Sequence, residues 1–270
     1  ERCRKVLEDD RVTCLELCTG PIAVAGSTRM QATTTELLVI GSALEAGLRD
    51  HLRHVLTPAQ YALVQREMAI EEDPAPLAAA RFAALLRDLR DEENTATLAR
   101  LADWETRRYR RNGRVTYFAG ACLLDIFTDT TERAPTFKIP PFRRHDDGMS
   151  PAPWAFVKDP CRGTPEAWDR VLEHAPRCLA WDGATYRRLG AAASIAANPP
   201  SIDRQDLYAF RIGNEADPSR TEAHPNAALA VLSDRDLPAQ AAWFADFERV
   251  AAGFDERAVL GIGTQQGLLP

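Results

Sequence analysis

The sequence has 270 residues, of which 45% are hydrophobic and 27% charged, a composition typical of globular proteins with one large or two ordinary domains. Its formal net charge of −6 predicts no general attraction to nucleic acid or to an anionic membrane surface. No apolar run reaches the ~18 residues of a membrane-spanning helix. We therefore expect a cytoplasmic protein that binds neither nucleic acid nor membranes.

The first 113 residues are predicted to be mostly helical. Apolar residues at three- and four-residue steps predict a long amphipathic helix, with its apolar stripe at Leu37, Ile40, Leu44, Leu48, Leu52 and Val55. Thr57-Pro58 ends this helix and begins another, because proline suits the first helical turn. The other elements expected here are a helix over 1–10, a short strand over 12–17, a hinge over 71–76, and helices over 77–90 and 91–111.

Strands and helices alternate in the second part of the sequence. Strands are predicted from β-branched, aromatic and other apolar runs over 114–120, 207–213, 228–234 and 258–263. Helices are expected over 121–133, 164–175 and 238–254, and a long ordered loop over 136–160. This alternation predicts an α/β fold with a mostly parallel sheet flanked by helices.

Most of the reactive side chains are better explained by structure than by chemistry. The six cysteines are scattered, and Cys14 and Cys18 lack a second pair or a histidine at zinc-ligand spacing, so buried free thiols are expected. His51 and His54 are expected to be exposed on a helix. Cys122, at a strand-to-helix turn, is expected to be a small packed residue rather than a nucleophile activated by helix amides.

A segment rich in hydroxyl groups, GPIAVAGSTRMQATTTELL, precedes the long helix at residues 20–38. The N-terminus of a helix offers unpaired N–H groups and partial positive charge, and Arg29 adds a full charge. This combination suits a phosphorylated or polyhydroxylated ligand. Because Ser27 or Thr28 could also be a simple helix cap, both interpretations stay open.

A second polar segment, LLDIFTDTTERAPTF, covers residues 123–137. Its carboxylates recur at four- and three-residue steps, at Asp125, Asp129 and Glu132. Three threonines accompany them, at positions 128, 130 and 131. Carboxylates are good acceptors for sugar hydroxyls, which favours a ligand-binding role. The alternative is a polar helix end at which Pro135 stops the helix.

Two stretches resemble the sugar isomerase (SIS) domain superfamily, in the branch of the N-acetylmuramic acid 6-phosphate etherases and the glucokinase regulatory protein. The stretch GPIAVAGSTRMQATTTELL is similar to the family's GPE-x-x-x-GSTRMKAGTAQK segment, and residues 26–30 match as a block. It departs from the family at Gln31, where lysine is usual, and at residues 32–35, which lack the usual glycine. The stretch GRVTYFAGACLLDIFTDTTERAPTFKIPPFRR resembles the start of a second SIS domain.

The resemblance implies two tandem SIS domains joined by a helical connector. It assigns residues 1–56 to the C-terminal part of a first SIS domain, 57–113 to the connector, and 114–270 to a second SIS-like domain. It also implies that the family's main phosphate loops and acid–base glutamates precede residue 1. We therefore assign no catalytic residue, expect no metal ion or cofactor, and expect residues 1–270 alone to show no turnover.

The ligand implied by the resemblance is a sugar phosphate, bound by Gly26, Ser27, Thr28, Arg29 and Glu132. For the complete protein it favours an etherase-type carbon–oxygen lyase of amino-sugar metabolism, in which a glutamate removes the proton next to the sugar carbonyl. Two alternatives stay open: a non-catalytic sugar-phosphate sensor that acts on a partner protein, and an aldose–ketose isomerase. A homodimer also stays open.

Overall fold

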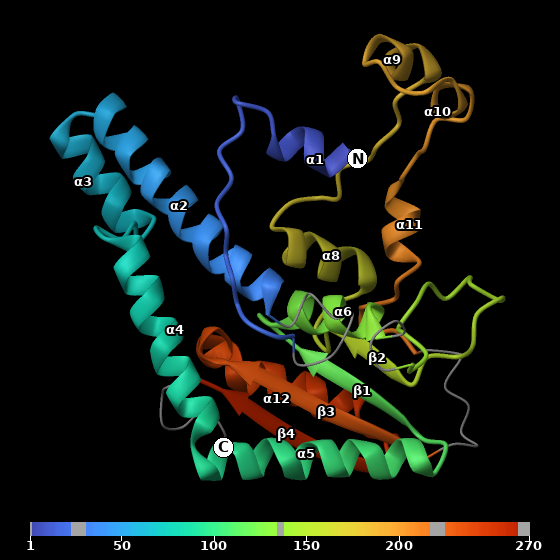
Figure 1. Ribbon diagram of the computed structural model, residues 1–270. Coiled ribbons are helices and arrows are strands. Elements are labelled where there is room, and N and C mark those ends of the chain that lie inside the picture. Colours follow the sequence, from blue (N-terminus) through green and yellow to red (C-terminus); the bar gives the residue numbers. More distant parts are fainter. Residues whose placement is uncertain (1, 23–30, 134–137, 217–224, 264–270) are drawn as a thin grey trace. The chain divides into compact units, whose positions relative to one another are not determined.

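The computed structural model describes residues 2–22, 31–133, 138–216 and 225–263 (Figure 1). The chain divides into two compact units, Glu1–Ala99 and Arg100–Pro270. Within the described ranges, every helix is too short or too polar to cross a bilayer.

The described part of the first unit is built from helices. They are α1 (Arg2–Leu7), α2 (Ala32–Val55), α3 (Pro58–Glu67), α4 (Pro74–Arg90) and the start of α5 (Glu92–Arg110), which continues into the second unit. Thr57 begins α3 as predicted, because its side chain accepts a hydrogen bond from the Gln60 N–H while the Gln60 side chain accepts one from the Thr57 N–H. The short strand expected over 12–17 is wrong, since these residues have no regular structure.

A four-stranded parallel sheet is the centre of the second unit, as far as the described residues show. Its strands are β1 (Arg114–Ala119), β2 (Ala155–Lys158), β3 (Asn226–Ser233) and β4 (Glu256–Ile262), in the order β2-β1-β3-β4. The two central strands, β1 and β3, are buried along almost their whole length, as expected of a parallel sheet covered on both faces. The predicted α/β fold with a parallel sheet flanked by helices is confirmed.

Helices cover both faces of this sheet (Figure 1). Val115 and Tyr117 of β1 point into one core, which contains side chains from α5, α6 (Leu123–Thr131) and α8 (Thr164–Leu172). Phe118 points into the other, against Trp243 and Phe247 of α12 (Gln240–Val250). The remaining elements are α9 (Gly183–Arg188), α10 (Ala193–Ala197), α11 (Arg204–Tyr208) and the 3-10 helix η2 (Asp234–Ala239).

Two elements of this unit differ from the sequence-based expectations. The expected loop over 136–160 contains β2, and the strand expected over 207–213 is absent, because α11 ends at Tyr208 and no strand follows before 217. A capping box explains the helix: the Asp203 side chain accepts from the Asp206 N–H, and the Asp206 side chain accepts from the Asp203 N–H.

Candidate functional site

The order of the strands defines a switch point at the carboxyl ends of β1 and β3. The chain leaves β1 towards β2 on one side of the sheet and leaves β3 towards β4 on the other. Open α/β sheets bind their ligands in the crevice outside such a point. Here it lies between Gly120-Ala121, which follow β1, and residues 234–236, which follow β3.

The floor of the switch point is held together by Asp236, which is only 6% exposed. Its Oδ1 accepts a hydrogen bond from the Ala121 N–H (2.8 Å), and its Oδ2 accepts from the N–H (2.8 Å) and hydroxyl (3.0 Å) of Ser233. A Cβ atom at Gly120 would lie 2.1 Å from Asp236 Oδ1, so only glycine fits this position without a shift. The ends of β1 and β3 are thus fixed against each other.

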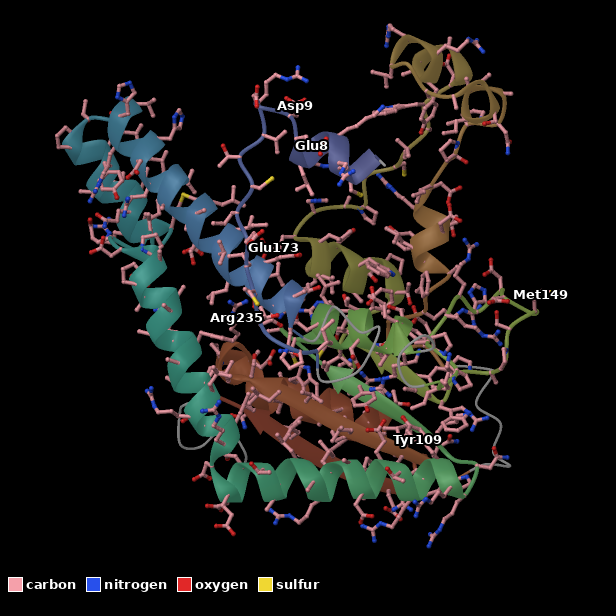
Figure 2. All side chains as sticks on the ribbon, viewed as in Figure 1. Glu8, Asp9, Tyr109, Met149, Glu173 and Arg235 are labelled. Atoms are coloured by element: carbon pink, nitrogen blue, oxygen red, sulfur yellow. The ribbon has the colours of Figure 1, made fainter. Side chains whose placement is uncertain are left out.

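A cavity of about 380 Å³ opens at this point, and we call it the switch crevice. Its lining combines backbone from the end of β1 with charged side chains from three other segments, at Gly120, Ala121, Leu124, Asp125, Arg170, Val171, Glu173 and Arg235. Glu173 and Arg235 are labelled in Figure 2. Arg170 belongs to the last turn of α8, and Asp125 to the first turn of α6.

Four charged side chains of the switch crevice have no bonding partner among the described residues. Within the described part of the chain, Asp125, Arg170, Glu173 and Arg235 are exposed and make no hydrogen bond or ion pair through their side chains. The first turn of α6 adds backbone N–H groups, since its N-cap residue, Cys122, makes no side-chain cap. Guanidinium groups and helix N–H groups bind anions, and carboxylates accept hydroxyl protons.

Cys122 faces away from this chemistry. Burial, together with the nearby charge of Asp236, raises the pKa of its thiol to about 11. Its Sγ donates a weak hydrogen bond to the Val231 carbonyl oxygen (3.7 Å). A thiol with such a pKa stays protonated at neutral pH, which agrees with a packed residue and not with a nucleophile.

Glu132, the acidic residue assigned to the sugar by the resemblance, does not line the switch crevice. It is exposed and is the C-cap of α6, where its N–H donates to the Asp129 carbonyl oxygen (3.2 Å). The nine residues of α6 separate it from Ala121 by about 13 Å along the helix axis. A contact between Glu132 and a sugar stays a prediction, and Asp125 is the carboxylate of α6 that reaches this crevice.

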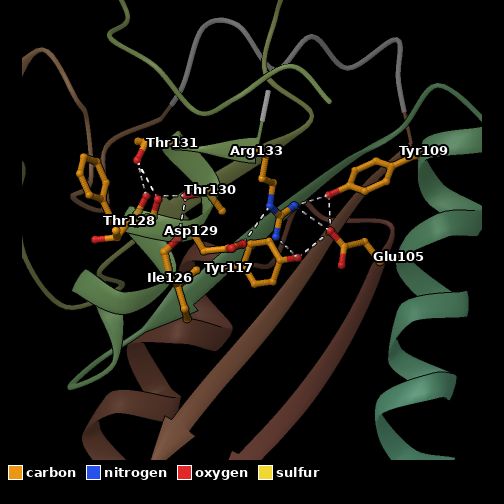
Figure 3. Close-up of polar contacts among 10 residues, drawn as sticks. Glu105, Tyr109, Tyr117, Ile126, Thr128, Asp129, Thr130, Thr131 and Arg133 are labelled. Carbon is orange, nitrogen blue, oxygen red and sulfur yellow. Dashed lines mark hydrogen bonds and ion pairs between the residues drawn. The ribbon is translucent and has the colours of Figure 1, made fainter. Parts of the chain in front are cut away.

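The threonines of α6 use their hydroxyl protons within the helix (Figure 3). Thr128 donates to the Leu124 carbonyl oxygen (2.9 Å), and the buried Thr130 hydroxyl lies 2.8 Å from the Ile126 carbonyl oxygen. Thr131 makes the same kind of bond to Phe127 (2.9 Å). Such bonds are common for threonine in helices, so these hydroxyls are explained without a ligand.

Arg133 belongs to a largely buried polar cluster that the sequence pattern did not indicate (Figure 3). Glu105 Oε1 accepts hydrogen bonds from the Tyr117 hydroxyl (2.6 Å), from Arg133 Nη1 (3.2 Å) and from the Tyr109 hydroxyl. Arg133 Nε also pairs with Asp129 Oδ2 (3.2 Å). The side chains of Arg133 and Glu105 are 13% and 19% exposed, so the cluster ties α5, β1 and the end of α6 together.

The other predicted site residues have different outcomes. Gly26, Ser27, Thr28 and Arg29 lie outside the residues that the structure describes. His51 and His54 are exposed, and no group of three or more possible metal ligands occurs among the described residues. The expectation that the cysteines are buried is wrong for four of them, since the structure exposes Cys3, Cys14, Cys18 and Cys178, and the other two, Cys122 and Cys161, are only partly buried.

Comparisons with protein-family models, with curated proteins and with solved structures found no match to this chain. The geometry of the switch crevice is therefore the main basis for a functional proposal.

Proposed function

We propose that this protein binds a sugar phosphate in the switch crevice. The observation that carries the proposal is the mixture of two arginines and two carboxylates in one cavity, Arg170 and Arg235 with Asp125 and Glu173. A cavity that held only a phosphate would need no carboxylate, and a carboxylate near the phosphate would weaken its binding. A ligand with a phosphate at one end and hydroxyl groups at the other suits both pairs.

The position of the crevice supports the same ligand class. It lies outside the carboxyl ends of parallel strands, beside the N-terminus of α6, where the backbone adds donors for a phosphate. The resemblance to SIS domains favours the same ligand class, and one of the two stretches that carry it, residues 113–144, includes Gly120, Ala121, Leu124 and Asp125 of this crevice. The resemblance also favours etherase-type elimination as the activity of the complete protein. A sensor, in contrast, would only need to bind the sugar phosphate.

The binding proposal is tested by calorimetric titration with hexose 6-phosphates, with and without an N-acetyl group. Arg170→Gln and Arg235→Gln should each weaken binding about tenfold or more, because each removes a charge-assisted hydrogen bond. Arg188→Gln, an exposed arginine on α9, is the matched control and should bind like the wild type. Inorganic phosphate and the unphosphorylated sugars should both bind more weakly than the sugar phosphate.

Wild-type affinity in the double variant Arg170→Gln/Arg235→Gln would rule out the switch crevice as the phosphate site. The activity proposal has a separate readout, lactate release from N-acetylmuramic acid 6-phosphate. Binding without lactate release by the complete protein would favour the sensor over the lyase.

A further inference from the structure

A second cavity, of about 550 Å³, lies at the other end of α6 and shares no residue with the switch crevice. We call it the loop pocket. One wall is aromatic and the other is charged, and the residues that decide its chemistry are Phe142, Arg143, Arg144, Asp146, Asp147 and Phe210.

The aromatic wall is firmly held. Phe142 is 4% exposed, and its ring meets those of Phe127, Phe156 and Phe210 edge to face, with centroids 5.9, 6.0 and 6.1 Å away. Its N–H donates to the Thr130 carbonyl oxygen at the end of α6 (3.0 Å). Phe142 is therefore fixed in the core, and the partly buried Phe210 is the ring of this wall with more accessible surface.

The loop that carries the charged wall is fastened to the segment around α11. The His145 N–H donates to the Ala209 carbonyl oxygen (2.8 Å), and Arg144 Nη1 pairs with Asp206 Oδ1 (2.5 Å). Arg144 also holds both oxygens of Asp146, through Nε (2.9 Å) and Nη2 (2.8 Å). Arg144 is thus shared between two carboxylates, Asp146 and Asp206, within the protein.

Asp147 is also engaged, chiefly by its own turn. Its Oδ1 accepts from the N–H groups of Met149 (2.9 Å) and Ser150 (3.1 Å), and its Oδ2 from the Ser150 hydroxyl (2.7 Å). These hydrogen bonds, that of the Ser150 hydroxyl first, hold the pKa of Asp147 below its ordinary value. Because Asp146 and Asp147 both have partners among the described residues, this wall offers no unpaired carboxylate for a cationic ligand.

Arg143 is the charged residue of this wall that is left incompletely paired. Its Nη1 lies 3.6 Å from Asp147 Oδ2, too far for a hydrogen bond, and this buried atom has no hydrogen-bond partner among the described residues. The side chain as a whole is 18% exposed. Buried donors in proteins are nearly always satisfied, so such a guanidinium next to a cavity calls for an acceptor.

We propose that the loop pocket binds a small aromatic oxyanion, an aryl phosphate or carboxylate, whose charged group pairs with Arg143 and whose ring packs against Phe142 and Phe210. Planar oxyanions and phosphates match the two-pronged donor geometry of arginine. This site is separate from the proposed sugar-phosphate site and does not depend on it.

The test is ligand-observed fluorine NMR with 4-fluorophenyl phosphate and 4-fluorobenzoate, which separates the two kinds of oxyanion. At least one of them should bind more tightly than inorganic phosphate and than neutral 4-fluorobenzyl alcohol. Arg143→Gln should weaken its binding about tenfold or more. Arg188→Gln, on α9 and outside the lining of both cavities, should leave it unchanged.

Unchanged binding in Arg143→Gln, or loss of binding in Arg188→Gln, would overturn the proposal, as would binding of the neutral alcohol as tight as that of the anions. Thermal unfolding of Arg143→Gln checks that the protein is folded. Asp147→Asn supplies a second measurement: it keeps an acceptor for the Met149 and Ser150 N–H groups but removes the charge that competes for Arg143. The anion should bind this variant several-fold more tightly, and weaker or equal binding would contradict the proposal.

Discussion

The carboxylate of Glu215 caps the N-terminus of α8 by binding Thr164: its Oε1 accepts from the Thr164 N–H (2.6 Å) and its Oε2 from the Thr164 hydroxyl (2.9 Å). The same hydroxyl accepts a hydrogen bond from the Gly213 N–H (3.0 Å). The buried Lys158 ammonium at the end of β2 donates to the carbonyl oxygens of Arg211, Gly213 and Glu215 (3.1, 3.0 and 2.9 Å). Residues 211–215 are therefore fastened to both β2 and α8.

Glu215→Ala should lower the free energy of unfolding by about 1–2 kcal/mol, the usual cost of losing a helix cap. The control is Glu166→Ala, which removes the same charge from the first turn of α8 without touching Thr164 and should cost only about 0.3–1 kcal/mol. Urea unfolding measures both. An equal loss of unfolding free energy in the two variants would mean that Glu215 stabilises α8 only through its negative charge and that its hydrogen bonds to Thr164 contribute nothing more.

The contribution of Glu215 should depend on pH. Burial by itself would raise its pKa, but the Thr164 N–H and hydroxyl outweigh burial and hold the pKa below the ordinary value of 4.5. A carboxyl with a depressed folded-state pKa contributes stability that is complete above its unfolded-state pKa and is lost as the pH falls through the folded-state value.

The test of this dependence is the difference in unfolding free energy between wild type and Glu215→Gln, which imitates the protonated form. We expect it to be constant from about pH 6 to pH 8 and to shrink below about pH 4.5. A Glu215 difference that grew on acidification would contradict the assignment.

How much of this fold the sequence could predict depends on the length of each signal. β1, β3 and β4 were predicted because each is a run of six or more mostly apolar or β-branched residues. β2 has four residues, Ala155–Lys158, in a proline-rich stretch, and its parallel partner β1 lies far away in the sequence. The apolar run at 207–213 predicted a strand, but the capping box at Asp203 starts a helix there instead, and that helix takes up the first residues of the run.

The site was less predictable, because its residues meet only through the fold. Arg170 and Arg235 carry no motif and come from segments 65 positions apart, so only the sheet order shows that they share a cavity. The acidic and hydroxyl pattern of α6 did signal polar residues, but the backbone of the helix takes up the threonine protons. The partners of Arg133 could not be read from local spacing either, since Glu105 lies 28 residues away.

Gly120→Ala should disturb the floor of the switch crevice, because the new Cβ would lie 2.1 Å from Asp236 Oδ1. We expect a loss of about 1–3 kcal/mol in unfolding free energy, as for other overpacked sites, and weaker sugar-phosphate binding. Gly148→Ala is the control, since nothing lies within 4 Å of its added Cβ, and it should cost less than about 0.5 kcal/mol. Similar stability of both variants would argue against the tight contact between Gly120 and Asp236.

The cysteines should fall into two classes of reactivity with iodoacetamide at neutral pH. Burial raises the pKa of Cys122 to about 11 and that of Cys161 to about 12, so their thiolate fractions are small. The exposed cysteines should be alkylated on the order of a hundredfold faster, as judged by peptide mass spectrometry over time: Cys3, Cys14, Cys18 and Cys178. In urea all six should react alike. Rapid alkylation of Cys122 in the folded protein would revive its interpretation as a nucleophile.

Substitutions of the two carboxylates at opposite ends of α6 distinguish two possible positions of the sugar phosphate: the switch crevice, and the position near Glu132 that the SIS resemblance implies. Asp125 lines the switch crevice, so Asp125→Asn should weaken sugar-phosphate binding about tenfold or more, because a hydroxyl loses a charged acceptor. Glu132 lies outside the crevice, at the C-cap of α6, so Glu132→Gln should bind within about twofold of the wild type if the resemblance places the ligand wrongly. Calorimetric titration of both variants with the same sugar phosphate decides between them.

Each of these variants controls for the other, since both remove one exposed negative charge from the same helix or its cap. Asp125→Asn also removes an acidic residue from the first turn of α6, which should cost about 0.3–1 kcal/mol of stability and is measured separately by thermal unfolding. A loss of affinity in Glu132→Gln with none in Asp125→Asn would move the sugar to the far end of α6. That result would overturn the switch crevice as the binding site while leaving sugar-phosphate binding itself intact, because the charge-assisted bond would only have been assigned to the wrong carboxylate.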